Sequence, residues 1–199
     1  METPQKKIEN TEDRSWNPFE PITIEIKKIE IPDNFESMCR DWVVNNGEYE
    51  DKNKFYTSFM VGNQKPDFAD PIIDKLVLPG TILSEAWIQT YKPGGFHGPH
   101  NHFGGENVLV GCLYLSSGES SIFQNPLLPS EHESTPVERG TVLYWHPALY
   151  HCSAPSDKTR TILAFNLIYD NRGILGDEEN SLFADVASYE DPYKDEYET

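Results

Sequence analysis

The sequence predicts an all-β domain, built as a sandwich or a barrel, with helical support near the N-terminus. Short runs rich in β-branched and aromatic residues follow one another through the second half of the chain, and Gly or Pro separates most of them. The 199 residues include 15 Pro and 13 Gly, which favour many turns. Aromatic residues make up 12% of the chain, whereas disordered chains are poor in them. We therefore expect one folded domain with a core of its own.

The first 80 residues are expected to support this domain. Residues 1–20 are polar, hold two prolines and predict a flexible arm. The near-alternation of Ile with polar residues over 22–31 predicts a strand. A helix should begin at Pro32-Asp33 and end near 45–47, where Asn-Asn-Gly is a stop signal. Its apolar face would consist of Phe35, Met38, Cys39 and Trp42. Residues 47–80 predict only a short helix around 71–76.

The later β-rich runs predict the core of the domain. They lie at 83–91, 107–115, 120–123, 141–145 and 159–169. Their short spacing favours a sandwich or barrel over alternating strand and helix units. Residues 177–199 hold nine acids and one base, a pattern typical of a solvated tail. The chain thus divides into a flexible arm (1–20), a single domain (21–176) and an acidic tail (177–199). Within the domain, 21–80 would support a core at 81–170.

Charge and cysteine content narrow the classes of partner. Lys and Arg number 16 against 33 Asp and Glu, so the net charge is −17. This charge repels phosphate backbones, so we expect no nucleic-acid partner, and it favours a cationic or neutral substrate over a polyanion. Three cysteines without CxxC spacing predict a reducing, cytoplasmic setting. No apolar run approaches 18 residues, so no membrane span is expected. The sequence does not predict an oligomeric state.

Three histidines lie close together in a segment rich in Gly and Pro, at positions 97, 100 and 102. In extended backbone, residues i and i+2 project to the same side, so His100 and His102 can present two imidazoles to one point. Imidazole binds iron, zinc, copper and nickel, which makes this segment a candidate metal site. Loops of this kind equally often carry exposed histidines that bind no metal.

A second group of chemically suggestive residues follows the strand at 141–145. His151 comes after a tight turn, and Arg160 opens the next strand. Strand alternation places Arg160, Ile162, Ala164 and Asn166 on one face. A guanidinium among apolar side chains needs an anionic partner, because burying it unpaired costs several kcal/mol. The planar carboxylate of a ligand would satisfy it.

In order and spacing, these pieces resemble the core of the Fe(II)/2-oxoglutarate-dependent oxygenases, most of all the small prolyl-hydroxylase-like members from bacteria and phages. The likeness runs from about Trp87 to Tyr169, a little under half of the chain. It is carried by His-Asn-His at 100–102, Val-Gly-Cys-Leu-Tyr-Leu at 110–115, Phe-Gln-Asn-Pro at 123–126, Glu-Arg-Gly-Thr-Val-Leu-Tyr-Trp at 138–145, His151, and Arg160 to Asn166. The resemblance implies a double-stranded β-helix (jelly-roll, cupin-like) with flanking N-terminal helices.

The resemblance also implies roles for individual residues. His100, His102 and His151 would hold Fe(II). Arg160 would pair with the distal carboxylate of the co-substrate 2-oxoglutarate, helped by the hydroxyl of Tyr114 or Tyr91. The implied reaction is an O2-dependent hydroxylation of a C–H bond in a small molecule or a peptide, with a prolyl or another amino-acid residue among the candidates.

Two positions depart from the family pattern. Most members carry Asp or Glu where this chain has His102, and an imidazole in place of a carboxylate makes the site more positive. The common Arg-x-Ser pair is here Arg160-Thr161-Ile162, which lacks the second residue's hydroxyl. Three alternatives therefore stay open. His97 could replace His100 as a ligand. The protein could be a cupin-like three-His metalloenzyme without 2-oxoglutarate, such as a thiol dioxygenase or an isomerase. It could also be a non-catalytic β-sandwich binding module.

Overall fold

The computed structural model describes residues 14–19, 22–61, 64–102, 107–117, 119–125 and 131–170. The acidic tail expected at 177–199 lies outside the described residues, as do residues 1–13 of the expected arm. Six other residues of that arm, Arg14–Phe19, form strand β1 and pair with the next strand. These six residues therefore belong to the large sheet, whereas the sequence predicted a flexible arm.

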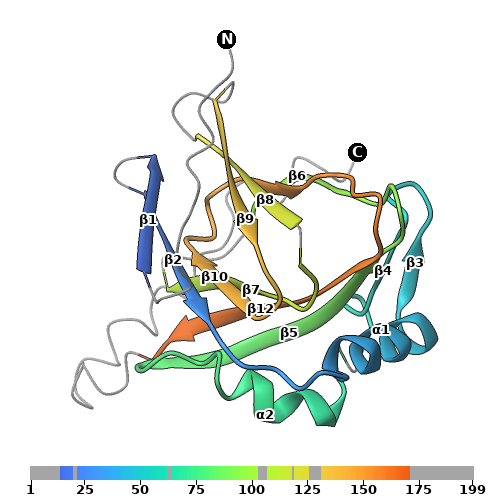
Figure 1. The fold of residues 1–199 in the computed structure, drawn as a ribbon. Helices are drawn as coiled ribbons and strands as arrows, with labels where there is room; N and C mark the ends of the chain where they lie inside the picture. Colours follow the sequence, from blue (N-terminus) through green and yellow to red (C-terminus); the bar gives the residue numbers. More distant parts are fainter. Residues whose placement is uncertain are drawn as a thin grey trace, which may run out of the picture.

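Two antiparallel sheets face each other across the interior (Figure 1). The large sheet has the strand order β1-β2-β10-β7-β12-β5-β4-β3, and the small sheet has the order β6-β11-β8-β9. The strands of the large sheet are β1 (Arg14–Phe19), β2 (Ile22–Lys28), β3 (Glu48–Glu50), β4 (Phe55–Thr57), β5 (Thr81–Tyr91), β7 (Val108–Tyr114), β10 (Thr141–Trp145) and β12 (Arg160–Tyr169). Those of the small sheet are β6 (His97–His100), β8 (Glu119–Gln124), β9 (His132–Val137) and β11 (His151–Ser153). The all-β prediction is confirmed.

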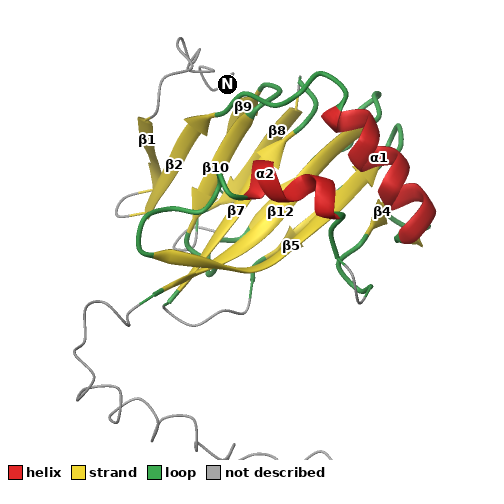
Figure 2. Cartoon of the chain, turned by 90° about the horizontal axis from the view of Figure 1, so that it is seen from below, coloured by secondary structure: helices red, strands yellow, loops and turns green. Residues whose placement is uncertain are grey.

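The helices lie against the outer face of the large sheet (Figure 2). They are α1 (Phe35–Asn46), a 3-10 turn (Asp67–Ala69) and α2 (Asp70–Ile73). Helix α1 falls within its predicted bounds, and it buries Phe35, Cys39 and Val43, which are spaced four residues apart. Met38, predicted on this face, is 38% exposed, because the buried stripe follows the four-residue spacing. The short helix predicted around 71–76 is α2, which ends three residues earlier.

The longer β-rich runs predicted from the sequence are all strands, but several short strands were not expected. β3 is exposed at all three positions, and β6 contains Gly98-Pro99, so neither shows an alternating pattern. β9 contains Pro136, which weakens a strand signal. These strands form because neighbouring strands pair with them, which the local sequence does not reveal.

Alternation along β12 divides the apolar interior into two layers. Leu163, Phe165 and Leu167 pack toward the helices, in the larger layer of buried side chains. Ile162 faces the other way, toward the small sheet. It packs against the second layer of buried side chains, which includes Phe123 and Trp145. The inner face of the large sheet therefore lines the space between the sheets. Neither described helix has the length and hydropathy that a bilayer span requires.

Candidate metal centre and its pocket

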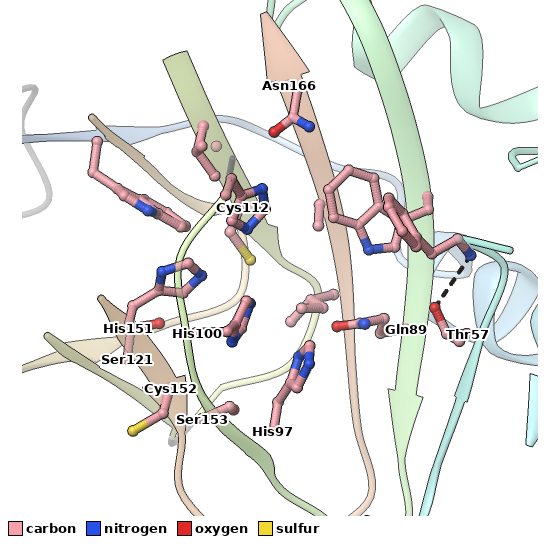
Figure 3. A pocket seen from close by; sticks show the side chains of 18 of the residues that line it. Thr57, Gln89, His97, His100, Cys112, Ser121, His151, Cys152, Ser153 and Asn166 are labelled. Atoms are coloured by element: carbon pink, nitrogen blue, oxygen red, sulfur yellow. Dashed lines mark hydrogen bonds between the residues drawn. The ribbon is translucent and has the colours of Figure 1, made fainter. Parts of the chain in front are cut away.

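A pocket of about 550 Å³ lies between the two sheets. Its walls come from the inner faces of β4, β5, β7, β10 and β12 on one side and from β6, β8 and β11 on the other. Figure 3 shows Asn166 at one end of the pocket and His97 at the other, with His100 and His151 between them. The lining is mostly apolar and aromatic, with a few polar groups that converge, which is typical of a small-molecule site.

The three histidines predicted as ligands meet in this pocket. His100 ends β6 and His151 begins β11, and the two residues are opposite each other in the pairing of these strands. His102 lies two residues after His100, so in extended backbone its side chain projects to the same side. One side-chain nitrogen from each of the three lies within 4.8 Å of the others. Nitrogens this close can converge on one metal ion after small side-chain adjustments.

Backbone carbonyls set the ring orientation of two of these histidines. Nδ1 of His100 is 2.9 Å from the carbonyl oxygen of Gly98. Nδ1 of His151 is 3.1 Å from the carbonyl oxygen of Leu149. A carbonyl only accepts, so each Nδ1 carries the proton and donates it. Each Nε2 is then left with its lone pair, which is the form that binds a metal.

The pocket keeps these imidazoles neutral. Burial lowers the pKa of His100, and it lowers the pKa of His151 well below 6.5, with the neighbouring imidazoles adding to the effect. Burial and then His100 lower the pKa of His102 to about 4, although the Asn166 amide acts in the opposite direction. Neutral imidazoles are the protonation state that metal binding requires.

His97 lies beside this group without belonging to it. Its ring stacks on His100 with 4.0 Å between centroids and contacts Phe55 at 5.2 Å. Burial, followed by the charges of His100, His102 and Arg160, lowers the pKa of His97 to about 3. The three converging nitrogens come from the other histidines. The arrangement therefore favours His100 over His97 as the ligand from β6.

The residues expected to bind a carboxylate gather at one end of the site, here called the Arg160 end: Gln89, Tyr91 and Tyr114 line the pocket there, and Arg160 stacks on Tyr91 without itself lining the pocket. Arg160 is 2% exposed, donates to the carbonyl oxygen of Gly95 at 3.0 Å, and places its guanidinium carbon 4.2 Å from the centre of the Tyr91 ring. Tyr91 and Tyr114 line the pocket. The hydroxyl of Tyr91 donates to Gln89 at 2.8 Å, and that of Tyr114 bonds with Ser121.

The opposite end of the pocket, here called the Glu85 end, is formed by four side chains that lie in a row across four paired strands. Strand pairing sets Asn166 beside Glu85 on β5 and beside Val110 on β7, and Val110 beside Trp145 on β10. All four side chains line the pocket. Asn166 lies on the strand face predicted from the sequence, whereas Glu85 was not among the predicted site residues. The alternation Glu85, Trp87, Gln89, Tyr91 on one strand would have revealed a carboxylate on an inward face.

Comparison with known proteins identifies the fold. No protein-family model and no curated protein matches the sequence. The structure is similar to a prolyl-4-hydroxylase from Pseudomonas putida, at 15% identity over 73% of this chain and 91% of that chain, with a TM-score of 0.52. It is also similar to the non-heme α-ketoglutarate-dependent epimerase SnoN from nogalamycin biosynthesis, at 12% identity over 73% and 77% of the two chains, with a TM-score of 0.55.

A third similar structure is HygX from Streptomyces hygroscopicus, which was solved with nickel and 2-oxoglutarate bound. The identity is 12% over 73% of this chain and 82% of that chain, and the TM-score is 0.53. At such identities the likeness is one of fold. The predicted double-stranded β-helix is confirmed.

Proposed function

We propose that the chain is a non-haem Fe(II) dioxygenase that uses 2-oxoglutarate and O2 to hydroxylate a C–H bond. One observation carries the proposal: three neutral imidazoles converge in a pocket between the sheets of a double-stranded β-helix. In HygX, a protein of the same fold, a divalent metal and 2-oxoglutarate are bound. The order of the sequence motifs, from the histidine pair to Arg160, supports the same assignment.

The donor set fits a divalent iron. His100, His102 and His151 would hold the ion through one nitrogen each, on one side, and would leave further coordination positions to ligands. When bound, Fe(II) together with 2-oxoglutarate supplies the oxidising power for C–H hydroxylation, which side chains alone lack. The carbonyls of Gly98 and Leu149 hold two of the rings in the tautomer that binds a metal.

The Arg160 end fits the distal carboxylate of 2-oxoglutarate. Arg160 lies behind the lining of this end, and its positive charge contributes, after burial and the other histidines, to lowering the pKa of His97 in the pocket. We expect Arg160, which is covered from solvent and stacks on Tyr91, to stabilise an anion at this end, where the hydroxyls of Tyr91 and Tyr114 would donate to it in place of their present partners Gln89 and Ser121. These hydroxyls would replace the one that is missing at Ile162, which contributes an apolar surface to the pocket.

The apolar pocket walls would limit the access of water to the reaction. Trp87, Phe55 and Val110 surround the histidines with apolar surface, and Trp87 lies 6.0 Å from the ring of His102. A dry site protects a reactive oxidant from side reactions and strengthens electrostatic interactions within it. The substrate we propose is a small molecule or a residue of a peptide, a prolyl or other amino-acid residue among them. We also propose a reducing, cytoplasmic location, which suits the three unpaired cysteines.

A cupin-like three-His enzyme without 2-oxoglutarate is the second candidate. Its support is the ligand set itself, which contains three imidazoles and no carboxylate. One experiment separates the two candidates. Metal-stripped protein is titrated anaerobically by calorimetry with Mn(II) as a surrogate for Fe(II), and then with 2-oxoglutarate. Variants are checked for folding by circular dichroism.

The oxygenase proposal predicts that 2-oxoglutarate binds only after the metal. His102→Ala should lose metal binding. Arg160→Met should bind Mn(II) normally and 2-oxoglutarate about tenfold or more weakly, because a charge-assisted hydrogen bond is lost. Arg160→Lys serves if the first variant does not fold, and Lys158→Met, at an exposed position nearby, is the matched control. Tight metal binding without 2-oxoglutarate would favour the second candidate. Binding of neither would leave the β-sandwich binding module.

A further inference from the structure

The two ends of the pocket differ in charge. Arg160 supplies a positive charge at one end, and Glu85 is half-buried at the other. Asn166 lies six positions after Arg160 on β12, which corresponds to about 20 Å of extended strand. Among the described residues that line the pocket, Glu85 carries the only formal charge when the histidines are neutral. The metal centre lies between a positive end and a negative end.

Glu85 fixes the orientation of the neighbouring amide. Nδ2 of Asn166 donates to Oε2 of Glu85 at 2.9 Å. A carboxylate can only accept, so the amide cannot be turned the other way and its Oδ1 must point away from Glu85. This oxygen is buried and has no hydrogen-bond partner of normal geometry among the described residues, although the amide interacts with the ring of His102. A buried carbonyl oxygen without a well-placed donor is costly, so a donor from a ligand would be stabilising here.

The Glu85 end thus offers two acceptors to a ligand. The carboxylate of Glu85 forms no ion pair with any cation of the described residues. Trp87 and Phe59, which contact each other at 4.9 Å, supply the apolar surface beside it. In such surroundings a carboxylate attracts a positive charge more strongly than it does in water. The group that satisfies both acceptors has several N–H donors and a positive charge.

We propose that the Glu85 end binds a primary ammonium group of the substrate, through the carboxylate of Glu85 and Oδ1 of Asn166. This inference rests on the proposed function, because it assigns the group to the molecule that is oxidised at the neighbouring metal centre. Asn166 lies close enough to His102 to affect its electrostatics. A substrate held at this end would extend from it toward the metal centre. The net charge of −17 draws such cations toward the protein.

The test uses probe molecules that differ only in charge. Full-length protein is loaded anaerobically with Mn(II) and 2-oxoglutarate. Binding of pentylammonium is compared with that of 1-pentanol and pentanoate, and binding of butylammonium with that of 1-butanol. Proton NMR of the probes gives the affinity, and line broadening by Mn(II) reports that the probe lies beside the metal. We expect each ammonium probe to bind about tenfold more tightly than its neutral analogue.

Substitutions at Glu85 decide whether this residue causes the preference. Glu85→Gln retains an acceptor for Asn166 and loses only the charge, so the preference should fall to about onefold. Glu85→Asp should retain it, and Glu48→Gln, at an exposed position of β3, should leave it unchanged. Equal binding of ammonium and neutral probes, no binding of either ammonium probe, or a preference that survives in Glu85→Gln would overturn the inference. Calorimetry with Mn(II) and 2-oxoglutarate alone reports separately whether the proposed function fails.

Discussion

The metal-free protein should lose stability as the pH falls from 6.5 to 4.5, because the folded state keeps the pocket histidines neutral. An unfolded histidine takes up a proton near pH 6.5, whereas His102 and His97 in the folded protein resist protonation until about pH 4 and about pH 3. The contribution to stability is therefore complete above pH 6.5. It is lost progressively below that value, since only the unfolded state binds the protons.

The size of the effect follows from these two pKa values. Each histidine costs about 1.4 kcal/mol for every pH unit between 6.5 and its folded pKa. His97 and His102 are partly exposed, and solvent screening reduces their combined cost over two pH units to about 3 kcal/mol. Since a domain is stable by only about 5–15 kcal/mol, this loss is large enough to measure. His100 and His151 act in the same direction.

Urea unfolding of chelator-treated protein at pH 6.5, 5.5 and 4.5 measures the loss. His97→Phe keeps an aromatic ring against His100 and Phe55 but binds no proton, so its loss over this range should be about 1.5 kcal/mol smaller than that of the wild type. Carboxylates titrate equally in both proteins and cancel in the difference. His132→Gln, an exposed position on β9, is the control. Parallel pH profiles for His97→Phe and the wild type would refute the reasoning.

Three further predictions concern the metal centre, the fold beneath it and the cysteines. Mn(II) at about a hundredfold excess over its Kd should stabilise the protein by about 2.7 kcal/mol in thermal unfolding, and His151→Ala should abolish the increase; an unchanged increase would contradict the ligand assignment. Gly111→Ala should destabilise by about 1–3 kcal/mol in urea unfolding, because the new Cβ would lie 2.1 Å from the buried ring of Phe165. Gly98→Ala, with open space at the same point, should change stability by less than about 0.5 kcal/mol, and equal effects at the two glycines would argue against this packing. Cys152 should react first with a thiol reagent, since the other two cysteines are buried; mass spectrometry of the labelled peptides would show any other order.

Local sequence patterns were sufficient for the long elements and for the pairing of His100 with His102. Strands β5, β7, β10 and β12 have enough alternating or apolar residues to be recognised alone, and helix α1 has a clear buried stripe. His100 and His102 could be paired in advance because two residues of extended backbone return a side chain to the same side. The short strands β3, β6 and β11 carry no such pattern, because pairing with neighbours creates them.

By itself, the sequence determined that the protein is an all-β domain with histidines spaced for a metal and an arginine on an inward strand face. Only the tertiary structure decided which groups share the pocket. It brought His151 opposite His100 through the pairing of β11 with β6, and it set Glu85 beside Asn166 through the pairing of β5 with β12. The physical reason is that strand register, which joins residues far apart in the chain, is set by the burial of whole sheet faces and not by the residues of one strand.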